Sequence, residues 1–190
     1  MTDMTDKRVL FGRGRFGPGA GTIPSSYELG DKGAAQTIRR LHTGDLVAIE
    51  RHLLGLSRLD RAARFLGTCS DARICAYARG LDPSNAILLG VFNSGGRLVG
   101  LAEAHPTDTP GTAEIAMSID PAYRRQGLCR RLFVRLLDLT FASGVQSVES
   151  RFDPRNQAVI RFGVSMGARL DPSSGHVAIS RDGYFTASLA

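Results

Sequence analysis

The chain has 190 residues, of which 43% are hydrophobic, and its formal net charge of +6 comes almost wholly from arginine. This length fits one globular domain with a substantial core, and neither an apolar run of roughly 20 residues nor a signal-peptide pattern indicates a membrane span or a secreted protein. We therefore expect a cytoplasmic protein with an anionic partner, a role that nucleic acid, an acidic surface or a phosphorylated cofactor would each fill.

Cysteines and histidines give no sign of a disulfide framework or a metal site. The three cysteines form an odd set without Cys-x-x-Cys spacing, and the four histidines lack metal-ligand spacing. We expect free thiols and no bound metal. The histidines, which we interpret as structural or surface residues, are His42, His52, His105 and His176.

Residues 1–33 contain little that can form a core. Their run over 12–21 is rich in glycine and arginine, which predicts a flexible N-terminal segment ahead of a single domain over 34–190. Gly12, Gly14 and Gly17 have the GxGxxG spacing of a dinucleotide-binding turn, but the prolines and glycines that follow exclude the helix which that motif needs. A basic arm that contacts nucleic acid or an acidic protein is the alternative.

Hydrophobic periodicity and turn residues predict a mixed α/β chain. In order, the predicted elements are a strand over 35–41, helices over 43–56, 57–67 and 71–80, strands over 86–92, 97–105 and 113–119, a helix over 128–142, a strand over 146–152, a helix over 155–166 and a hairpin over 177–188. This order predicts an α/β (α+β) fold, in which a β-meander is followed by a right-handed strand-helix-strand crossover.

The strand over 113–119 and the helix from Leu128 are joined by Arg124-Arg125-Gln126-Gly127-Leu128-Cys129-Arg130-Arg131. A glycine-containing turn that opens a helix exposes unpaired backbone N–H groups at the positive end of the helix dipole, which favours an anion there. The planar guanidinium groups of the flanking arginines match phosphate oxygens. The turn therefore predicts a pyrophosphate cradle, with a solvated basic turn as the alternative.

This turn resembles the acyl-CoA loop of the GNAT superfamily of N-acetyltransferases, whose pattern is Arg/Gln-x-x-Gly-x-Gly/Ala. The resemblance covers roughly residues 36–188 and is strongest over 113–168. It implies a mostly antiparallel central sheet flanked by helices, with a βαβ unit that binds acetyl-CoA. The residues implied to bind this acyl donor are Met117, Ser118 and Ile119 along the pantetheine, Gln126, Gly127, Leu128, Cys129 and Arg130 around the pyrophosphate, Arg124, Arg125 or Arg131 at the 3′-phosphate, and Asn156 and Phe162 in the following helix.

Some positions depart from the family pattern or have a second interpretation. Cys129 replaces glycine or alanine; we expect it to be buried and inert, with a reactive thiol of lowered pKa as the alternative. Gly163 stands where many members carry the tyrosine that protonates the departing thiolate. Three alternatives follow: the thiolate leaves unaided, Ser165 or water supplies the proton, or the protein binds CoA without fast catalysis. Asn156 is either a cofactor contact or a helix cap.

A narrower similarity is to the catalytic domain of bacterial protein-lysine acetyltransferases. It rests on the run over 113–116, the helical region over 43–81 and the tyrosine-free second helix, and it implies that Glu114 is the general base. A base is required because an amine with a pKa near 10.4 is mostly protonated at neutral pH. Glu114 is our first candidate and Glu103 our second, each with a strand-edge ion pair as the alternative.

The sequence therefore predicts an N-acetyltransferase that moves an acetyl group from acetyl-CoA directly to a primary amine of a protein lysine or a small molecule. A nucleophilic Cys129 is a minor alternative. Two other functions stay open, namely a regulatory domain that binds acyl-CoA without catalysis and an adaptor that acts through the basic arm. We expect no membrane contact and disfavour nucleic acid as a partner, while the acceptor amine and a homodimer stay open.

Overall fold

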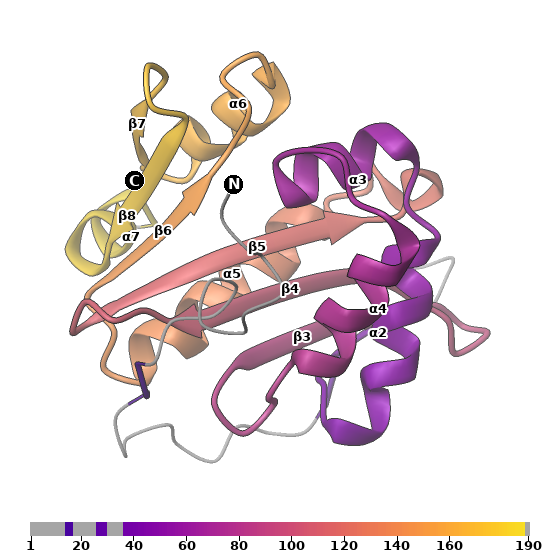
Figure 1. Ribbon diagram of the computed structural model, residues 1–190. Helices are drawn as coiled ribbons and strands as arrows, with labels where there is room; N and C mark the ends of the chain where they lie inside the picture. Colours follow the sequence, from indigo (N-terminus) through magenta and orange to yellow (C-terminus); the bar gives the residue numbers. More distant parts are fainter. Residues whose placement is uncertain (1–13, 17–25, 30–35, 189–190) are drawn as a thin grey trace.

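The computed structural model describes residues 14–16, 26–29 and 36–188, without the side chains of 26–29 and 185–188. In these ranges the chain forms a sheet of eight strands in the order β1-β2-β3-β4-β5-β6-β8-β7 (Figure 1). The strands are β1 (Ser26–Leu29), β2 (Gln36–Arg40), β3 (Ile87–Phe92), β4 (Leu98–Pro106), β5 (Thr112–Ile119), β6 (Ser147–Arg151), β7 (Arg169–Asp171) and β8 (His176–Ser180). All neighbouring strands are antiparallel except β5 and β6, which confirms the predicted mixed, mostly antiparallel sheet.

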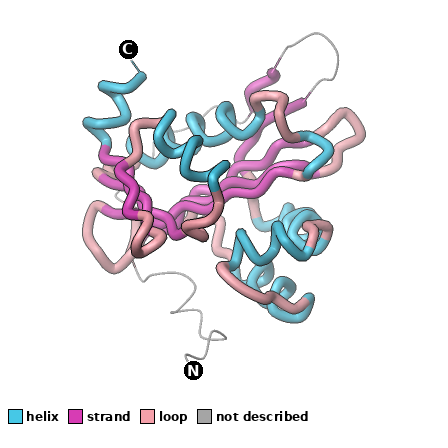
Figure 2. The backbone as a smooth tube through the Cα atoms, turned by 90° about the horizontal axis from the view of Figure 1, so that it is seen from above, coloured by secondary structure: helices cyan, strands magenta, loops and turns pink. Residues whose placement is uncertain are grey.

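Helices cover both faces of this sheet (Figure 2). One face carries α2 (Leu46–Leu54), which follows the short 3-10 turn η1 (Thr43–Asp45), together with α3 (Arg58–Phe65) and α4 (Asp71–Gly80). The opposite face carries α5 (Leu128–Ala142), the helix that connects β5 to β6. Because β5 and β6 are parallel, these three elements form the predicted βαβ unit.

The alternation of side chains along each strand decides which helices they meet. In β4, Leu101 belongs to the core that contains Ile49 of α2 and Ile74 of α4, whereas Ala102 belongs to the core that contains Leu132 of α5. Two hydrophobic cores, one on each side of the sheet, therefore hold the helices in place.

The predicted helix starts follow from local capping. Ser57 Oγ accepts a hydrogen bond from the backbone N–H of Asp60 at 3.1 Å, and α3 begins at the next residue, as the predicted capping box requires. At its other end, Leu66 adopts a left-handed conformation with φ of 53° and ends α3 just before Gly67. The predictions for α2, α3 and α4 are confirmed within a few residues.

The C-terminal hairpin predicted over 177–188 is wrong. β8 pairs with β7, which was not predicted, and residues Arg181–Ser188 form the helix α7. Local capping explains the difference, because Ser180 Oγ accepts from the N–H of Gly183 at 3.2 Å. Packing adds to it: Tyr184 is buried against Phe141 and donates a hydrogen bond to Asp138 at 3.0 Å.

The start of α6, the helix after β6, also differs from the prediction. α6 covers Gln157–Ser165 and begins two residues after the predicted start at 155. Arg155 lies before the helix, in an exposed ion pair of 2.8 Å with Asp153. Asn156 begins the helix because its side chain accepts from the N–H of Val159.

Two described pieces lie in the predicted N-terminal segment over 1–33. Ser26–Leu29 forms the edge strand β1 against β2, an element that was not predicted. The carbonyl of Gly14 accepts from Asn85 Nδ2 at 3.1 Å, and Phe16 packs against the core beneath α5. The expected flexible segment and its boundary at residue 33 otherwise lie outside the described residues and stay predictions.

Candidate active site

β5 and β6 pair over a short distance and then part. Their paired positions run from Thr112 with Ser147 to Glu114 with Glu149. Beyond Glu114, β5 pairs only with β4 among the described strands, and Figure 1 shows β6 turning away from it. The outer edge of β5 over 115–119 therefore has backbone N–H and C=O groups that an extended ligand can pair with. This edge contains the predicted residues Met117, Ser118 and Ile119.

Glu114 lies where the two strands part. Its side chain is exposed, and its backbone pairs with His105 of β4 on one side and with Glu149 of β6 on the other. Directly paired residues of antiparallel strands point to the same face, with Cβ atoms about 4.5–5.5 Å apart. Glu114 and His105 therefore lie beside each other on the face that carries α2, α3 and α4.

Glu103, the second predicted base, is in a different environment. Its side chain is fully buried and contacts Arg64 Nη2 at 2.6 Å, the Tyr77 hydroxyl at 2.6 Å and His105 Nε2 at 3.1 Å. Burial opposes the charged form of Glu103, but Arg64 and the hydrogen bonds from His105 and Tyr77 outweigh it and lower the pKa of the carboxyl to about 2. A carboxylate with so low a pKa is a weak base, so these contacts favour Glu114 as proton acceptor.

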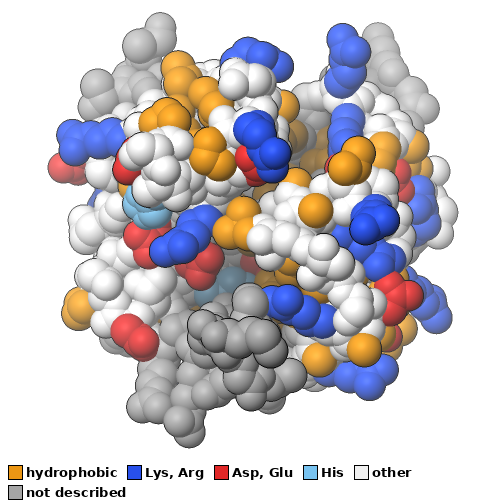
Figure 3. All heavy atoms as spheres, turned by 45° about the horizontal axis from the view of Figure 1, so that its top comes forward, with side chains coloured by type: hydrophobic (Ala, Val, Ile, Leu, Met, Phe, Trp, Pro, Cys, Tyr) orange, Lys and Arg blue, Asp and Glu red, His pale blue; other side chains and the backbone are white. Residues whose placement is uncertain are grey.

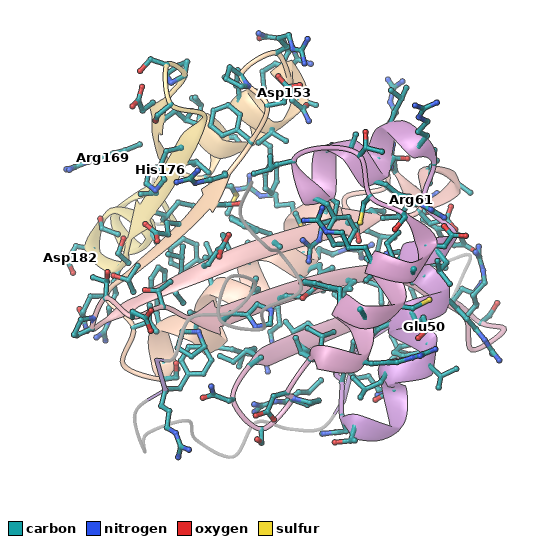
Figure 4. The ribbon with its side chains drawn as sticks, viewed as in Figure 1. Glu50, Arg61, Asp153, Arg169, His176 and Asp182 are labelled. Carbon is teal, nitrogen blue, oxygen red and sulfur yellow. The ribbon has the colours of Figure 1, made fainter. Side chains whose placement is uncertain are left out.

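A second acid-histidine pair continues the same face across the gap. His176 Nε2 of β8 lies 3.2 Å from Glu149 Oε2 of β6, and each side chain is 39% exposed. Figure 4 shows His176 on β8, and Figure 3 shows acidic and histidine side chains close together among arginines on the face in view. Glu103, His105, Glu114, Glu149 and His176 are together called the acidic strip below.

The predicted anion loop has the backbone geometry of a cradle. After the 3-10 turn η2 (Pro121–Tyr123), Arg125 and Gly127 have left-handed backbones with φ of 62° and 73°, and α5 begins at Leu128. The left-handed Gly127 directly before the helix leaves the first N–H groups of α5 at an exposed position. Arg125, Gln126, Gly127 and Arg130 are all exposed around them.

Arg124 fastens this loop to the rest of the protein. Its Nε donates to the carbonyl of Ile119 at 3.0 Å, and its Nη2 lies 2.7 Å from Asp60 Oδ1 at the start of α3. Arg131 and Gln126 donate to loop carbonyls within the same turn. The exposed cations Arg125 and Arg130 are therefore better placed than Arg124 to meet a phosphate.

The surroundings of Cys129 favour an inert thiol. It is partly buried in the first turn of α5, and burial raises the pKa of the thiol, with only a smaller opposing effect from Arg124. A thiol with a raised pKa is mostly protonated at neutral pH and is a weak nucleophile. These observations disfavour the alternative of a reactive Cys129.

The predicted residues of α6 have structural roles. Asn156 caps the helix, and Phe162 packs edge-on against Phe133 of α5 with ring centroids 5.1 Å apart. Gly163 is buried, and a Cβ atom there would lie 3.4 Å from the side chain of Leu170 of β7, so α6 approaches the sheet closely at this position. Ser165 donates its hydroxyl to the carbonyl of Phe162 at 2.7 Å.

Sequence reasoning missed His105, Arg64 and Tyr77 as neighbours of the site. His105 was interpreted as structural or surface, although the alternation Glu103-x-His105 in a predicted strand puts both residues on one face. The register that places His105 opposite Glu114 depends on the turn over 107–111, in which Thr107 N–H donates to the carbonyl of Thr112. That register could not be read from the hydrophobic pattern.

A surface pocket of about 380 Å³ lies at the other end of β5. It is lined by α2 and the β3–β4 turn and includes Arg51, His52, Arg97 and Asp120, but none of the predicted site residues lines it among the described part of the chain. His52 connects it to β5 because its Nε2 lies 2.9 Å from Ser118 Oγ.

The described residues contain neither a cluster suited to a metal ion nor a helix suited to span a membrane. No cluster of three or more His, Cys, Asp or Glu side chains suited to a metal ion occurs in 14–16, 26–29 and 36–188. Over the same ranges, no helix has the length and apolar character needed to cross a membrane.

Comparison with known proteins gives both a family match and similar structures. Residues 53–167 match the model of the acetyltransferase (GNAT) family. The GNAT domain of S. lividans PAT is similar, with a TM-score of 0.69 and 15% identity over 84% of this chain and 99% of that chain. No curated protein matches the sequence.

Two further similar structures are complexes with acetyl-CoA or CoA. Salmonella typhimurium yncA, a putative acetyltransferase with its cofactor acetyl-CoA, has a TM-score of 0.59 and 21% identity over 76% of this chain and 93% of its own. Vibrio cholerae spermidine N-acetyltransferase, in complex with CoA and spermine, has a TM-score of 0.61 and 18% identity over 79% of this chain and 98% of its own. At these identities the likeness shows a shared fold.

Proposed function

The chain belongs to the acetyltransferase (GNAT) family, and we propose that it transfers an acetyl group from acetyl-CoA to a primary amine, with Glu114 as the general base. The observation that carries the proposal is the parting of β5 and β6 at Glu114, on the same strand that leads into the exposed loop before α5. A protein lysine and a small-molecule amine are both candidate acceptors.

The residues along β5 and the loop suit the chemistry of acetyl-CoA. The open backbone edge at Met117, Ser118 and Ile119 can pair with the amides of pantetheine as an added strand would. The N–H groups that follow Gly127, with Arg125 and Arg130 beside them, can hold the pyrophosphate. When bound, acetyl-CoA would supply the activated acetyl group as a thioester.

Glu114 is suited to accept the proton of the entering amine. Its side chain is exposed at the point where the strands part, next to the edge proposed for pantetheine. An amine with a pKa near 10.4 must lose a proton before it attacks, and a well-placed carboxylate typically contributes 100- to 10,000-fold to such a step. A backbone N–H of the open edge can stabilise the oxyanion. The acidic strip also favours a cationic acceptor.

The departing thiolate has no tyrosine at position 163 to protonate it. Ser165, one of the alternatives, already donates its hydroxyl to Phe162, which supports departure unaided or with water. Free thiols have a pKa near 8.5, so an unprotonated thiolate is an acceptable leaving group near neutral pH. Gly163 also keeps the second candidate function open, a regulatory domain that binds acyl-CoA without fast catalysis.

Two measurements on the purified protein test the proposal. Thermal unfolding in the presence of acetyl-CoA, CoA or ATP tests binding. A ligand at about 100 times its Kd adds roughly 2.7 kcal/mol to the free energy of unfolding, which raises the unfolding midpoint by a few degrees. Release of CoA thiol with spermidine and with a lysine-containing peptide tests transfer. A shift with acetyl-CoA and CoA but not ATP, together with thiol release, is expected. A shift without thiol release from any amine would favour the regulatory domain, and the absence of any shift would favour the adaptor.

A further inference from the structure

The side chain of Arg124 joins three parts of the candidate site. Its Nε donates to the carbonyl of Ile119, the last residue of β5, at 3.0 Å, and its Nη2 lies 2.7 Å from Oδ1 of Asp60 in the first turn of α3. Arg124 itself follows η2 and begins the loop that leads into α5. One guanidinium group therefore connects the open edge of β5, the helix α3 and the loop proposed to hold the pyrophosphate.

The contact with Ile119 fixes where the open edge of β5 ends. The N–H of Asp120 donates to the carbonyl of Val99 in β4 at 2.8 Å. Backbone groups of successive strand residues point to opposite sides, so the carbonyl of Ile119 points away from β4, to the side on which β6 has parted from β5. Arg124 binds this carbonyl and so closes the edge directly before the loop.

Both carboxylate oxygens of Asp60 have a partner. Oδ2 accepts from the Ser57 hydroxyl at 2.7 Å, and the oxygen of that hydroxyl accepts in turn from the Asp60 N–H at 3.1 Å. Oδ1 is left for Arg124. One turn further along α3, Arg64 pairs with the buried Glu103 of β4 and holds the helix on the sheet. The first turn of α3 therefore offers Arg124 a carboxylate of fixed orientation.

The backbone of the loop requires such an anchor. Arg125, the residue after Arg124, has a φ of 62°, a left-handed conformation that residues with a Cβ atom rarely adopt. A backbone of this kind persists only where the surrounding structure determines it. The two bonds of Arg124 fix the chain immediately before Arg125, and the left-handed Gly127 completes the turn into α5.

We propose that Asp60 is a positioning residue for acetyl-CoA. It holds Arg124 against Ile119, and this clasp sets the loop over 125–127 in the geometry that binds the pyrophosphate. Arg124 then acts through the loop and does not itself contact a phosphate. The inference rests on the proposed acetyl transfer and adds to the same site a residue from α3. Arg124 is 43% and Asp60 23% exposed, which suits a role in geometry, because partly exposed pairs contribute little to the free energy of unfolding.

The clasp can be tested without any ligand. We expect Asp60→Asn to loosen the loop, so that the NMR order parameters of the backbone amides over 125–127 fall from near 0.85, typical of a rigid backbone, toward about 0.6. Asp45→Asn is the matched control, because Asp45 forms a similar pair of 2.6 Å with Arg39 beside β2. It should leave these order parameters unchanged. An unchanged loop in Asp60→Asn would overturn the clasp.

Equilibrium binding of acetyl-CoA, measured by calorimetry, tests the effect of the clasp on the site. We expect Asp60→Asn to raise Kd at least about fivefold, Asp60→Glu to recover part of this loss, and Asp45→Asn to bind as the wild type does. The kcat at saturating acetyl-CoA should stay within about twofold in Asp60→Asn, because a loosened loop weakens the binding of substrate and transition state alike. An unchanged Kd in Asp60→Asn would overturn the positioning role.

A double-mutant cycle separates positioning from direct contact. If Arg124 acts only through the clasp, Arg124→Gln and Asp60→Asn raise Kd by similar factors, and the double variant binds acetyl-CoA about as well as either single variant. Losses that add would mean that Arg124 contacts the ligand itself, and would overturn the positioning role. Failure of the wild type to bind acetyl-CoA or CoA would instead overturn the proposed function, and the order parameters would still decide whether the clasp holds the loop.

Discussion

Nη2 of Arg64 on α3 lies 2.6 Å from Oε1 of Glu103 on β4, and the two side chains are only 8% and 0% exposed. The pair joins the helical layer to the middle of the sheet, and Tyr77 of α4 donates to the same carboxylate. Because Glu103 also contacts His105, this buried ion pair lies directly behind the residue that faces Glu114. The proposed base Glu114 is therefore paired, through its backbone, with a residue of this buried cluster.

Removal of Arg64 should destabilise the protein strongly. Arg64→Met leaves the carboxylate of Glu103 buried and without its cation, which typically costs about 3–5 kcal/mol. The matched control is Arg79→Met, whose exposed pair with Glu50 is 3.3 Å long and should contribute about 0–1 kcal/mol. Urea unfolding at pH 7 measures both free energies. Equal losses in the two variants would show that the buried pair has no special role.

Glu103 should also make stability depend on acid pH. Its pKa in the folded protein, about 2, lies below the value near 4.3 of an unfolded glutamate, so its contribution is complete above pH 4.3 and is lost as the pH falls toward 2. Unfolding free energies measured between pH 5 and pH 2.5 should fall more steeply for the wild type than for Glu103→Gln. Parallel curves would mean that the carboxyl has the same pKa in both states.

Gly127→Ala should weaken acetyl-CoA binding more than it weakens the fold. Gly127 has a φ of 73° and open space where the methyl group of alanine would lie, so the cost to folding is the left-handed backbone alone, about 1–2 kcal/mol. Gly144, with a φ of 92° and equally open space at the far end of α5, provides the control. We expect both variants to lose similar stability, but only Gly127→Ala to raise the KM for acetyl-CoA. A KM raised equally in Gly144→Ala would remove the loop from the site.

Cys129 should be dispensable for turnover. Burial raises the pKa of its thiol, which leaves little thiolate at neutral pH. Cys129→Ala should therefore retain kcat within about twofold, since direct transfer needs no acyl-enzyme. Intact-mass spectrometry of the wild type after mixing with acetyl-CoA alone should show no added acetyl group that is absent from Cys129→Ala. Loss of turnover together with such an adduct would indicate covalent catalysis.

Local patterns predicted most of the fold. The alternation in β5 and the leucine repeat in α5 place both elements correctly because each buries one continuous face. α7 was mistaken for a strand because the deciding contacts of Tyr184, with Phe141 and Asp138, come from a helix more than forty residues away in sequence. Propensity is a weak guide where such tertiary contacts decide the structure.

The candidate site was predictable in part. The loop before α5 is a local feature, so its glycine and arginines could be singled out from the sequence alone as a candidate anion site. A preference for Glu114 over Glu103 as candidate base required the fold, because the buried partners of Glu103 are distant in sequence: Arg64 lies 39 positions before it and Tyr77 lies 26 before it. The facing of His105 and Glu114 likewise depends on strand register, which hydrophobic alternation does not fix to the residue.

The most direct test of acetyl transfer is the turnover of acetyl-CoA with a lysine-containing peptide or spermidine by the wild type, Glu114→Gln and Glu50→Gln. Glu50 undergoes the same chemical change on α2, away from β5 and β6 (Figure 4). We expect Glu114→Gln to lose about 100- to 10,000-fold in kcat and to keep the thermal shift with acetyl-CoA. The control Glu50→Gln should turn over at the wild-type rate. Full turnover by Glu114→Gln, with normal acetyl-CoA binding, would contradict the role proposed for Glu114.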